Sequence, residues 1–231
     1  HVGSNKSSIL FMDLVSRRAV GEPISHIISS RAFWKNDFYI DKTVLDPRAE
    51  SELIIEITKD LLFDGMKVLD LGCGSGCIGI SLYKENPNIS LSLADFSKKA
   101  IKISEKNAAD LKIECEIIHS NLFATISGKF DLIVTNLPYI TKGDFFFLQK
   151  EIILYEPHEA LYGGVSGLDA IKLFLSSVDR YLNKNGVFVV EFGKGQDVLL
   201  KKELLKANFA NFAFHEDLNQ VKRLVCVKKD T

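Results

Sequence analysis

Two short runs of the sequence carry residues whose types and spacing could do chemistry. The first, residues 70–76 with the sequence DLGCGSG, follows an apolar segment and contains three glycines. The second, residues 136–139 with the sequence NLPY, follows another apolar segment. Glycine-rich turns let a ligand approach the backbone closely, and asparagine offers an amide oxygen that can accept an N–H. These runs are therefore the candidates for a ligand site and for the group that acts on a substrate.

The glycine-rich run is expected to hold a cofactor that carries a nucleoside. Glycine permits positive φ, and the helix that follows offers free N–H groups at its start. Asp95 ends the next apolar run and can accept both hydroxyls of a ribose, while Phe96 beside it can cover an adenine ring. A nicotinamide dinucleotide remains open at this point, although the dehydrogenase pattern prefers glycine where this chain has Ile78.

The NLPY run suits a substrate nitrogen that lies in a plane. An amide nitrogen is a poor nucleophile because its lone pair is delocalised. The Asn136 side-chain oxygen can accept one N–H and the Leu137 carbonyl the other, which favours a pyramidal nitrogen and frees its lone pair. Pro138 stiffens the loop, and the Tyr139 ring can pack on the flat substrate group. No strong base is needed, because the nitrogen becomes cationic and loses its proton afterwards.

The segments around these runs alternate between strand and helix patterns. Strands are predicted at 67–71, 89–94, 114–119, 130–135 and 187–192, with a short strand at 38–40 and a closing pair at 212–215 and 223–227. Helices are predicted at 50–62, 76–83, 97–109 with Ser97 as N-cap, 168–182 and 197–206. This order predicts an α/β, Rossmann-like fold with a seven-stranded, mostly parallel sheet, helices on both faces and an antiparallel closing strand. Ligands then bind beyond the carboxyl ends of the strands.

Composition bounds the class of protein. The 231 residues are 46% hydrophobic and 26% charged, and the net charge of −1 counts against a dedicated nucleic-acid binder. The four cysteines form no CxxC pair and no zinc-type cluster with histidine, so we expect reduced thiols and no metal. No apolar run approaches the roughly 20 residues that cross a membrane, and no secretory leader is visible. We therefore expect a cytoplasmic protein with no membrane partner.

The two runs also resemble the motifs of a known class. Asp70 followed by GxGxG resembles the first motif of class I methyltransferases, whose glycines hold the methionine end of S-adenosyl-L-methionine. In that class Asn121 and Leu122, after the third strand, fall where adenine is contacted. NLPY resembles the [N/D]-P-P-Y tetrapeptide of methyltransferases that act on planar nitrogens. NLPY itself occurs in rRNA adenine dimethyltransferases, whereas the glutamine-N5 family usually has NPPY.

A third stretch chooses between these two substrates. Residues 156–168, EPHEALYGGVSGL, closely resemble the E-P-x-x-A-L-x-G-G-x-x-G-L stretch of the HemK/PrmC family. Further matches are GEPI at 21–24, RAFW at 31–34, Pro47-Arg48 with Glu52, and VEFG at 190–193 with Gln196. The resemblance implies methyl transfer to the side-chain amide nitrogen of the glutamine in the Gly-Gly-Gln motif of class I peptide-chain release factors, with S-adenosyl-L-homocysteine as product. Arg48 is expected either to form a structural ion pair or to contact substrate or cofactor.

The resemblance also implies a domain plan and a set of site residues. Residues 1–48 are expected to be an extension with a short hairpin, in which 9–19 are a remnant of the substrate-binding domain, and 49–231 the methyltransferase domain. The expected catalytic and substrate-binding residues are Asn136, Leu137, Pro138 and Tyr139. The expected cofactor-binding residues are Asp70, Gly72, Cys73, Gly74, Ser75, Gly76, Asp95, Phe96, Asn121, Leu122 and Asn136. The expected partner is a release factor, with no stable nucleic acid, and the chain is expected to be a monomer.

Other functions stay open from the sequence. An N6-adenine methyltransferase acting on RNA or DNA is the main alternative, and Leu137 motivates it. A non-catalytic binding module with a surviving fold is a second, because the N-terminal helical domain of the family is nearly absent from this sequence. A dehydrogenase is the third.

Overall fold

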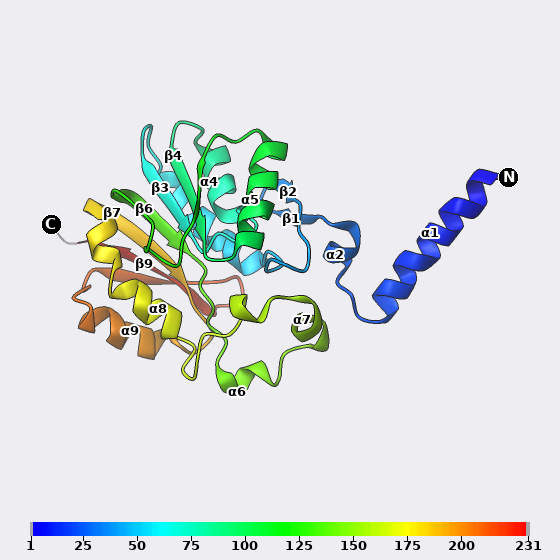
Figure 1. Ribbon diagram of the computed structural model, residues 1–231. Coiled ribbons are helices and arrows are strands. Elements are labelled where there is room, and N and C mark those ends of the chain that lie inside the picture. The colour runs from blue at the N-terminus through cyan, green and yellow to red at the C-terminus, as the bar shows by residue number, and fades with distance from the viewer. Residues whose placement is uncertain (1, 230–231) are drawn as a thin grey trace.

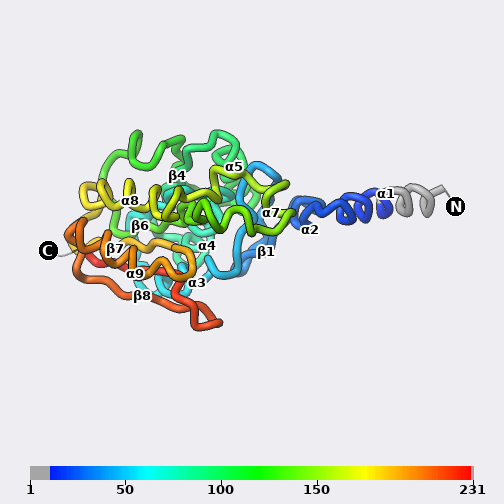
Figure 2. Tube along the Cα trace, turned by 90° about the horizontal axis from the view of Figure 1, so that it is seen from below, coloured from blue at the N-terminus to red at the C-terminus, as the bar shows by residue number. Residues whose placement is uncertain are grey.

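The computed structural model describes residues 2–229, and its N-terminal part is a helix that stands away from the body. This helix, α1 (Val2–Ala19), leads through the short α2 (Ile24–Ile28) into a hairpin of β1 (Arg31–Phe33) and β2 (Asn36–Phe38). Figures 1 and 2 both show α1 projecting from the body. The hairpin was predicted, but the strand expected at 38–40 was placed too late, because β2 ends at Phe38.

A seven-stranded sheet forms the centre of the body. Its spatial order is β5-β4-β3-β6-β7-β9-β8, and β9 runs antiparallel to both of its neighbours while the other pairs are parallel. The predicted sheet is therefore confirmed, including the antiparallel closing strand. The strands are β3 (Lys67–Leu71), β4 (Ser90–Asp95), β5 (Glu116–His119), β6 (Phe130–Thr135), β7 (Leu182–Glu191), β8 (Phe212–Glu216) and β9 (Lys222–Lys228).

The register of this sheet brings the two candidate runs together. Leu71 lies beside Thr135 in the β3–β6 pair and beside Ala94 in the β3–β4 pair. Thr135 Oγ1 also donates a hydrogen bond of 2.6 Å to the carbonyl of Leu71. Because these parallel strands end at the same edge, the loops that follow β3, β4 and β6 start side by side.

Helices cover both faces of the sheet (Figure 1). Strand residues alternate between the two layers: Leu69 and Ile133 belong to one apolar cluster, whereas Val68 and Leu132 belong to the other. One cluster includes side chains of α8 (Asp169–Leu175) and α9 (Asp197–Lys206). The other includes side chains of α3 (Glu52–Thr58), α4 (Cys77–Glu85) and α5 (Lys98–Leu111). Within residues 2–229, no helix is long and apolar enough to cross a membrane.

The segment 168–182 departs from the single helix expected there. The helix α8 ends at Leu175, a 3₁₀ turn covers Val178–Tyr181, and β7 begins at Leu182 instead of residue 187. At the end of this helix the Ser176 Oγ donates to the Leu173 carbonyl at 2.7 Å, and the Ser177 N–H donates to the Phe174 carbonyl in a tighter, 3₁₀-type bond. Val178 still faces the core with its side chain fully buried, so the apolar spacing was retained although the helix was not.

Two further helices lie between β6 and β7, where no helix was predicted. They are α6 (Lys142–Phe145) and α7 (Lys150–Tyr155), followed by a 3₁₀ turn at His158–Ala160. The short helix predicted at 50–62 is α3, flanked by 3₁₀ turns at Ala49–Ser51 and Lys59–Leu61. Ser97 caps α5 as predicted, with its Oγ accepting from the Ala100 N–H at 3.4 Å.

Candidate active site

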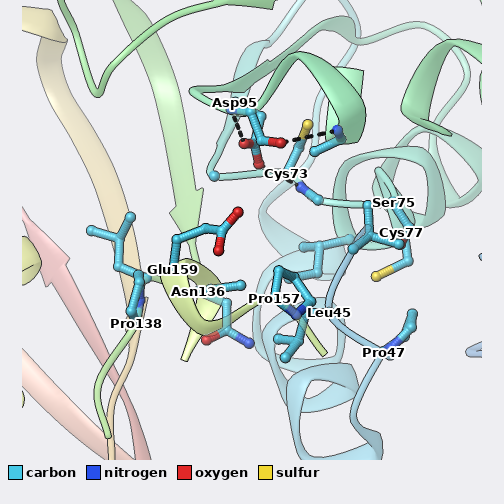
Figure 3. A pocket seen from close by; sticks show the side chains of 18 of the residues that line it. Leu45, Pro47, Cys73, Ser75, Cys77, Asp95, Asn136, Pro138, Pro157 and Glu159 are labelled. Atoms are coloured by element: carbon cyan, nitrogen blue, oxygen red, sulfur yellow. Dashed lines mark hydrogen bonds between the residues drawn. The ribbon is translucent and has the colours of Figure 1, made fainter. Parts of the chain in front are cut away.

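A pocket opens at the carboxyl ends of β3, β4 and β6 (Figure 3). Three of its walls come from the glycine loop (residues 72–76), from the end of β4, and from the NLPY loop (residues 136–139). Two more were not expected: the N-terminal arm (residues 43–51) and the turn 157–160. Its lining residues include Leu45, Pro47, Arg48, Ser51, Gly72, Cys73, Gly74, Ser75, Asp95, Phe96, Asn136, Leu137, Pro138, Pro157 and Glu159.

The glycine loop depends on backbone conformations that favour glycine. Gly72, Gly74 and Gly76 have φ of 76°, 55° and 80°. A Cβ on Gly76 would approach Ser104 and Leu93 to 3.3 and 3.2 Å, so a side chain there would also crowd the core. The N–H groups of Gly72 and Cys73 both donate to the Ala94 carbonyl, at 2.7 and 3.0 Å, which ties the loop to β4.

Asp70 lies beneath the pocket surface, where it contacts the start of α4, and it does not line the pocket. Its side chain is fully buried, and Oδ2 accepts the Gly79 N–H at 2.8 Å in the first turn of α4. Its other oxygen, Oδ1, is buried without a hydrogen-bond partner in the described part of the chain. Burial raises the pKa of Asp70 to about 7.

Asp95 connects the second strand to the glycine loop. Its Oδ2 accepts the Gly74 N–H at 2.9 Å and its Oδ1 accepts the Ser97 N–H at 2.8 Å. A carboxylate offers about four acceptor positions, so two remain for a ligand's hydroxyls. Burial raises the pKa of Asp95, opposed by those backbone hydrogen bonds. The neighbouring Phe96 is half exposed at the pocket edge.

Asn107 on α5 locks the glycine loop against the chain that leads into the N-terminal arm. Its Nδ2 donates to the carbonyls of Ser75 and Tyr39, at 2.8 and 2.9 Å, and its Oδ1 accepts the Tyr39 N–H at 2.7 Å. Asn107 is almost completely buried, and each of these bonds satisfies a backbone group. Asn107 therefore fixes the backbone at Tyr39, a few residues before the pocket wall 43–51, relative to the glycine loop.

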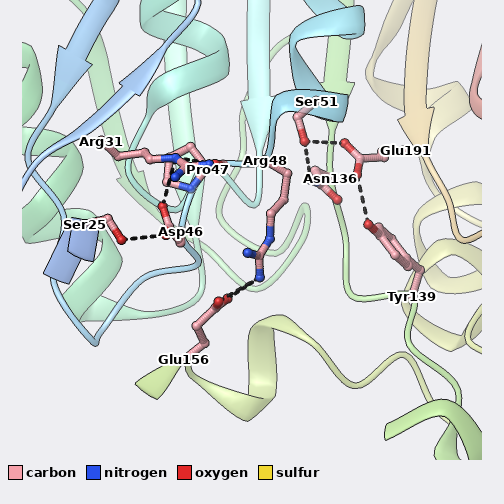
Figure 4. Close-up of polar contacts among 10 residues, drawn as sticks. All are labelled: Ser25, Arg31, Asp46, Pro47, Arg48, Ser51, Asn136, Tyr139, Glu156 and Glu191. Atoms are coloured by element: carbon pink, nitrogen blue, oxygen red, sulfur yellow. Dashed lines mark hydrogen bonds and ion pairs between the residues drawn. The ribbon is translucent and has the colours of Figure 1, made fainter. Parts of the chain in front are cut away.

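Asn136 begins a series of hydrogen bonds that includes Ser51, Glu191 and Tyr139 (Figure 4). Its Nδ2 donates to Ser51 Oγ at 3.0 Å, and Ser51 Oγ donates to Glu191 Oε2 at 2.5 Å. The Tyr139 hydroxyl donates to Glu191 Oε1 at 3.0 Å. Among residues 2–229, no donor bonds to Asn136 Oδ1 or to the Leu137 carbonyl, so neither oxygen is used by a hydrogen bond within the described chain.

The segment 156–167 holds the NLPY loop in place. Backbone hydrogen bonds join Ile140 N to the Leu161 carbonyl at 3.0 Å and Gly163 N to the Ile140 carbonyl at 2.9 Å. A Cβ on Gly163 would lie 2.5 Å from the Pro138 carbonyl, and one on Gly167 would lie 2.3 Å from the Tyr139 carbonyl. These glycines are therefore needed for close backbone approach, which gives a physical reason for the G-G-x-x-G pattern of this stretch.

An ion pair joins two segments that line the pocket. Arg48 Nη2 donates to both oxygens of Glu156, at 2.8 and 2.7 Å, and the Glu156 side chain is 3% exposed (Figure 4). Burial raises the pKa of Glu156 and Arg48 opposes that shift. The pair joins the N-terminal arm to the turn that carries Pro157 and Glu159. Of the two roles expected for Arg48, the ion pair is formed, and the side chain also lines the pocket.

The structure brings most, but not all, of the predicted residues to the pocket. Asp70, Gly76, Asn121, Leu122 and Tyr139 are not among its lining residues. Asn121 is exposed, so its contact with adenine stays a prediction. The thiols of Cys73 and Cys77 are buried, and burial raises the pKa of Cys77 to about 12, so both line the pocket as small apolar groups.

Sequence reasoning missed Ser51, Glu191 and the pocket-lining role of residues 43–47. Glu191 stands in the VEFG match, and Ser51 stands between Pro47-Arg48 and Glu52, so the signal was present only as resemblance. Ser51 and Glu191 are polar residues next to apolar runs. They could have been identified as candidates on that ground, because buried polar groups need a hydrogen-bond partner.

Solved structures identify the class to which the fold belongs. The chain is similar to the T. thermophilus 16S rRNA N2 G1207 methyltransferase in complex with AdoMet and guanosine, with a TM-score of 0.63 and 17% identity over 87% of this chain and 49% of that one. It is also similar to the ribosomal protein L11 methylase from Lactobacillus delbrueckii, with a TM-score of 0.58 and 19% identity over 79% of this chain and 80% of that one. These two likenesses show that the chain has the class I methyltransferase fold.

Sequence comparisons narrow the class to a family. Residues 44–164 match the family described as the methyltransferase small domain. A release factor glutamine methyltransferase of Koribacter versatilis is 34% identical over 95% of this chain and 79% of the relative. One of Borreliella burgdorferi is 37% identical over 94% of this chain and 77% of the relative. The chain belongs to the HemK/PrmC family of release factor glutamine methyltransferases.

Proposed function

We propose that this chain methylates the side-chain amide nitrogen of the glutamine in the Gly-Gly-Gln motif of class I peptide-chain release factors. The observation that carries the proposal is the free Oδ1 of Asn136 at the pocket, next to the free carbonyl of Leu137. Relatives named for this activity, at 34–37% identity over most of the chain, support the choice of substrate.

The residues that line the pocket fit S-adenosylmethionine. Asp95 keeps two acceptor positions for ribose hydroxyls, and the exposed Phe96 ring lies beside it for the adenine. The glycine loop offers backbone close enough for the methionine end, and the start of α4 carries partial positive charge. When bound, this group supplies an electrophilic methyl carbon attached to a positively charged sulfur.

The NLPY loop prepares the amide nitrogen of the substrate. Asn136 Oδ1 accepts one N–H and the Leu137 carbonyl accepts the other, and the two acceptors out of the amide plane reduce delocalisation of the nitrogen lone pair. As the nitrogen gains positive charge, both N–H groups become stronger donors, so these two hydrogen bonds strengthen in the transition state. The proton leaves the cationic nitrogen afterwards, so no base is required in the pocket.

The walls around this loop hold the reacting groups in line. Leu137 is buried against Gly72, where a Cβ would lie 3.4 Å from Leu137 Cδ2. The glycine loop and the NLPY loop are therefore in contact, with cofactor and substrate sides at adjacent strand ends. Fixed positions of this kind lower the barrier by converting an encounter into a reaction between groups already aligned.

The proposal is tested by incubating the chain with a release factor and S-adenosylmethionine labelled in its methyl group. Label in the release factor, lost when its Gly-Gly-Gln glutamine is replaced by alanine, is the expected result. Label in RNA or DNA instead, with binding that weakens steeply as salt rises, would support the N6-adenine alternative and overturn this substrate.

A further inference from the structure

Glu191 is a buried carboxylate placed directly behind the NLPY loop by the last residue of β7. It is 1% exposed, and its two oxygens accept hydrogen bonds from two hydroxyls, those of Ser51 and Tyr139. In the described part of the chain it forms no ion pair. Arg223, whose charge lowers the pKa of Glu191, is itself paired with Asp217 at 3.1 Å. Burying a carboxylate whose hydrogen bonds come from neutral hydroxyls lowers the free energy of unfolding, which points to a role beyond packing.

Ser51 stands between this carboxylate and Asn136, and it has one proton to give. An ionised carboxylate only accepts, so the Ser51 proton is directed to Glu191 Oε2, 2.5 Å away. The Ser51 oxygen is then left with lone pairs toward Asn136. The amide can meet those lone pairs only with its NH₂ group, as the 3.0 Å hydrogen bond from Nδ2 shows.

This direction of hydrogen bonding decides how Asn136 faces the pocket. The two orientations of an asparagine amide have nearly the same shape and differ only in which side carries oxygen. With Nδ2 on Ser51, the oxygen is left to accept an N–H of the substrate. In the opposite orientation, NH₂ would face the substrate N–H, and Oδ1 would face the lone pairs of Ser51.

We propose that Glu191 and Ser51 are positioning residues for methyl transfer, which act by holding the Asn136 amide with Oδ1 available to the substrate. The hydrogen bonds from Asn136 through Ser51 to Glu191 also polarise one another. The Ser51 hydroxyl, polarised by Glu191, is a better acceptor for Asn136 Nδ2, so Asn136 Oδ1 becomes more negative. The negative charge also favours a substrate nitrogen that turns cationic. This inference rests on the proposed function, because it assigns Ser51 and Glu191 to the transfer step.

Protonation of Glu191 should remove its effect on the orientation of the Asn136 amide. A neutral carboxyl has a proton to donate and no charge, so the Ser51 proton is no longer drawn away from Asn136. Burial raises the pKa of Glu191, the hydrogen bonds from Ser51 and Tyr139 and the charge of Arg223 oppose the rise, and Glu50 adds to it. The rate of transfer is therefore expected to fall as pH drops through the raised pKa of Glu191.

Kinetics of four variants test the proposal in the full chain with a release factor as substrate. Glu191→Gln and Ser51→Ala are each expected to lower kcat about tenfold, with KM and the Kd of S-adenosylmethionine within about twofold of wild type, because the lost interaction matters mainly in the transition state. Ser51→Thr keeps the hydroxyl and should keep most of kcat. Thr58→Val removes another buried hydroxyl, that of the last residue of α3, which donates to the Ile54 carbonyl, and should leave kcat unchanged.

Two further readouts separate positioning from a merely structural role. The double variant Glu191→Gln, Ser51→Ala should have the kcat of the single variants, because both residues act through the same series of hydrogen bonds to Asn136. Glu191→Gln should also lose the decline of kcat at acid pH. Unchanged kcat in both single variants, additive losses, or an unchanged pH profile in Glu191→Gln would overturn the proposal.

A measurement without turnover keeps this inference distinct from the proposed function. The side-chain NH₂ signal of Asn136 in an NMR spectrum is assigned by its absence in Asn136→Asp. In Ser51→Ala we expect that signal to move upfield and to exchange faster with water than in wild type. If the Asn136 signal is unchanged in Ser51→Ala, the inference is wrong. If the wild-type chain leaves the release factor unmethylated, the proposed function is wrong instead.

Discussion

Arg48 and Glu156, 108 positions apart in the chain, form an ion pair in which one guanidinium nitrogen contacts both carboxylate oxygens at 2.7–2.8 Å. The pair connects two walls of the pocket, the N-terminal arm (residues 43–51) and the turn 157–160, both of which lie outside the sheet. Arg48 belongs to the N-terminal arm, and Glu156 precedes the turn that carries Pro157 and Glu159. The contact therefore ties the segment before the sheet to the insertion between β6 and β7.

Replacement of Arg48 by methionine should destabilise the chain. Glu156 would be left as a buried carboxylate without its partner, which costs about 3 kcal/mol in the free energy of unfolding. Urea unfolding at pH 8 measures this cost, and Lys106→Met is the control because its pair with Asp110 is exposed. Adding Glu156→Gln to Arg48→Met should recover part of the loss. Equal costs for Arg48→Met and Lys106→Met would contradict the assignment.

Asp95→Asn should weaken the binding of S-adenosylmethionine. The amide group can accept only one of the two backbone N–H groups that Asp95 now holds, and it offers fewer acceptors to the ribose. The Kd measured by calorimetry should rise about tenfold or more. Asp131→Asn is a matched control, because Asp131 also accepts a backbone N–H, that of Lys67, but at the far end of the sheet. A similar Kd for both variants would show that Asp95 does not hold the cofactor.

Asp70 should make the stability of the chain depend on pH. Its pKa is raised from 3.8 to about 7 in the folded chain, so between these values the folded state keeps a proton that the unfolded state has released. The free energy of unfolding therefore falls as pH rises through this window, by about 1.4 kcal/mol per pH unit at most, and levels off above it.

Asp70→Asn removes this titration and isolates its contribution. The difference in unfolding free energy between variant and wild type, measured in urea from pH 4 to 8, should grow in favour of the variant up to pH 7. A difference that stays constant over this range would show that Asp70 is ionised in the folded chain at all these pH values.

Gly163→Ala should disturb the reaction more than the binding of the cofactor. The new Cβ would lie 2.5 Å from the Pro138 carbonyl, so the NLPY loop must shift. Displacement of a reacting group by about 1 Å can cost a hundredfold in rate, and we expect kcat to fall at least tenfold. Gly143→Ala, where the nearest atom is Thr141 Oγ1 at 3.7 Å, serves as control. If both variants keep full kcat, the segment 156–167 does not position the loop.

The fold was predictable because its signals are local. The strands at 67–71 and 130–135 agree with the predicted bounds, since buried parallel strands are short apolar runs bounded by loops. The bounds of the helix within 168–182 were not predictable, because the buried apolar spacing is the same whether the segment is α-helix throughout or changes to a 3₁₀ turn after Leu175. Periodicity predicts which side faces the core, and hydrogen bonds of single side chains set the ends of elements.

The site was predictable only where its residues lie next to each other in sequence. The glycine loop and the NLPY loop were found because each is a contiguous motif at a strand end. Ser51 and Glu191 were not, because their roles depend on hydrogen bonds that span 85 and 52 positions, from Ser51 to Asn136 and from Tyr139 to Glu191. Contacts of that kind follow from the register of the sheet and the path of the N-terminal arm, which no local pattern encodes.

The most direct test of the account is to locate the methyl group by tandem mass spectrometry. A release factor is incubated with S-adenosylmethionine and either the wild-type chain or Asn136→Ala, after calorimetry has shown that both bind the cofactor. We expect one methyl group on the side-chain nitrogen of the Gly-Gly-Gln glutamine with wild type and none with Asn136→Ala. An unmodified glutamine with a wild-type chain that binds the cofactor, or full methylation by Asn136→Ala, would contradict it.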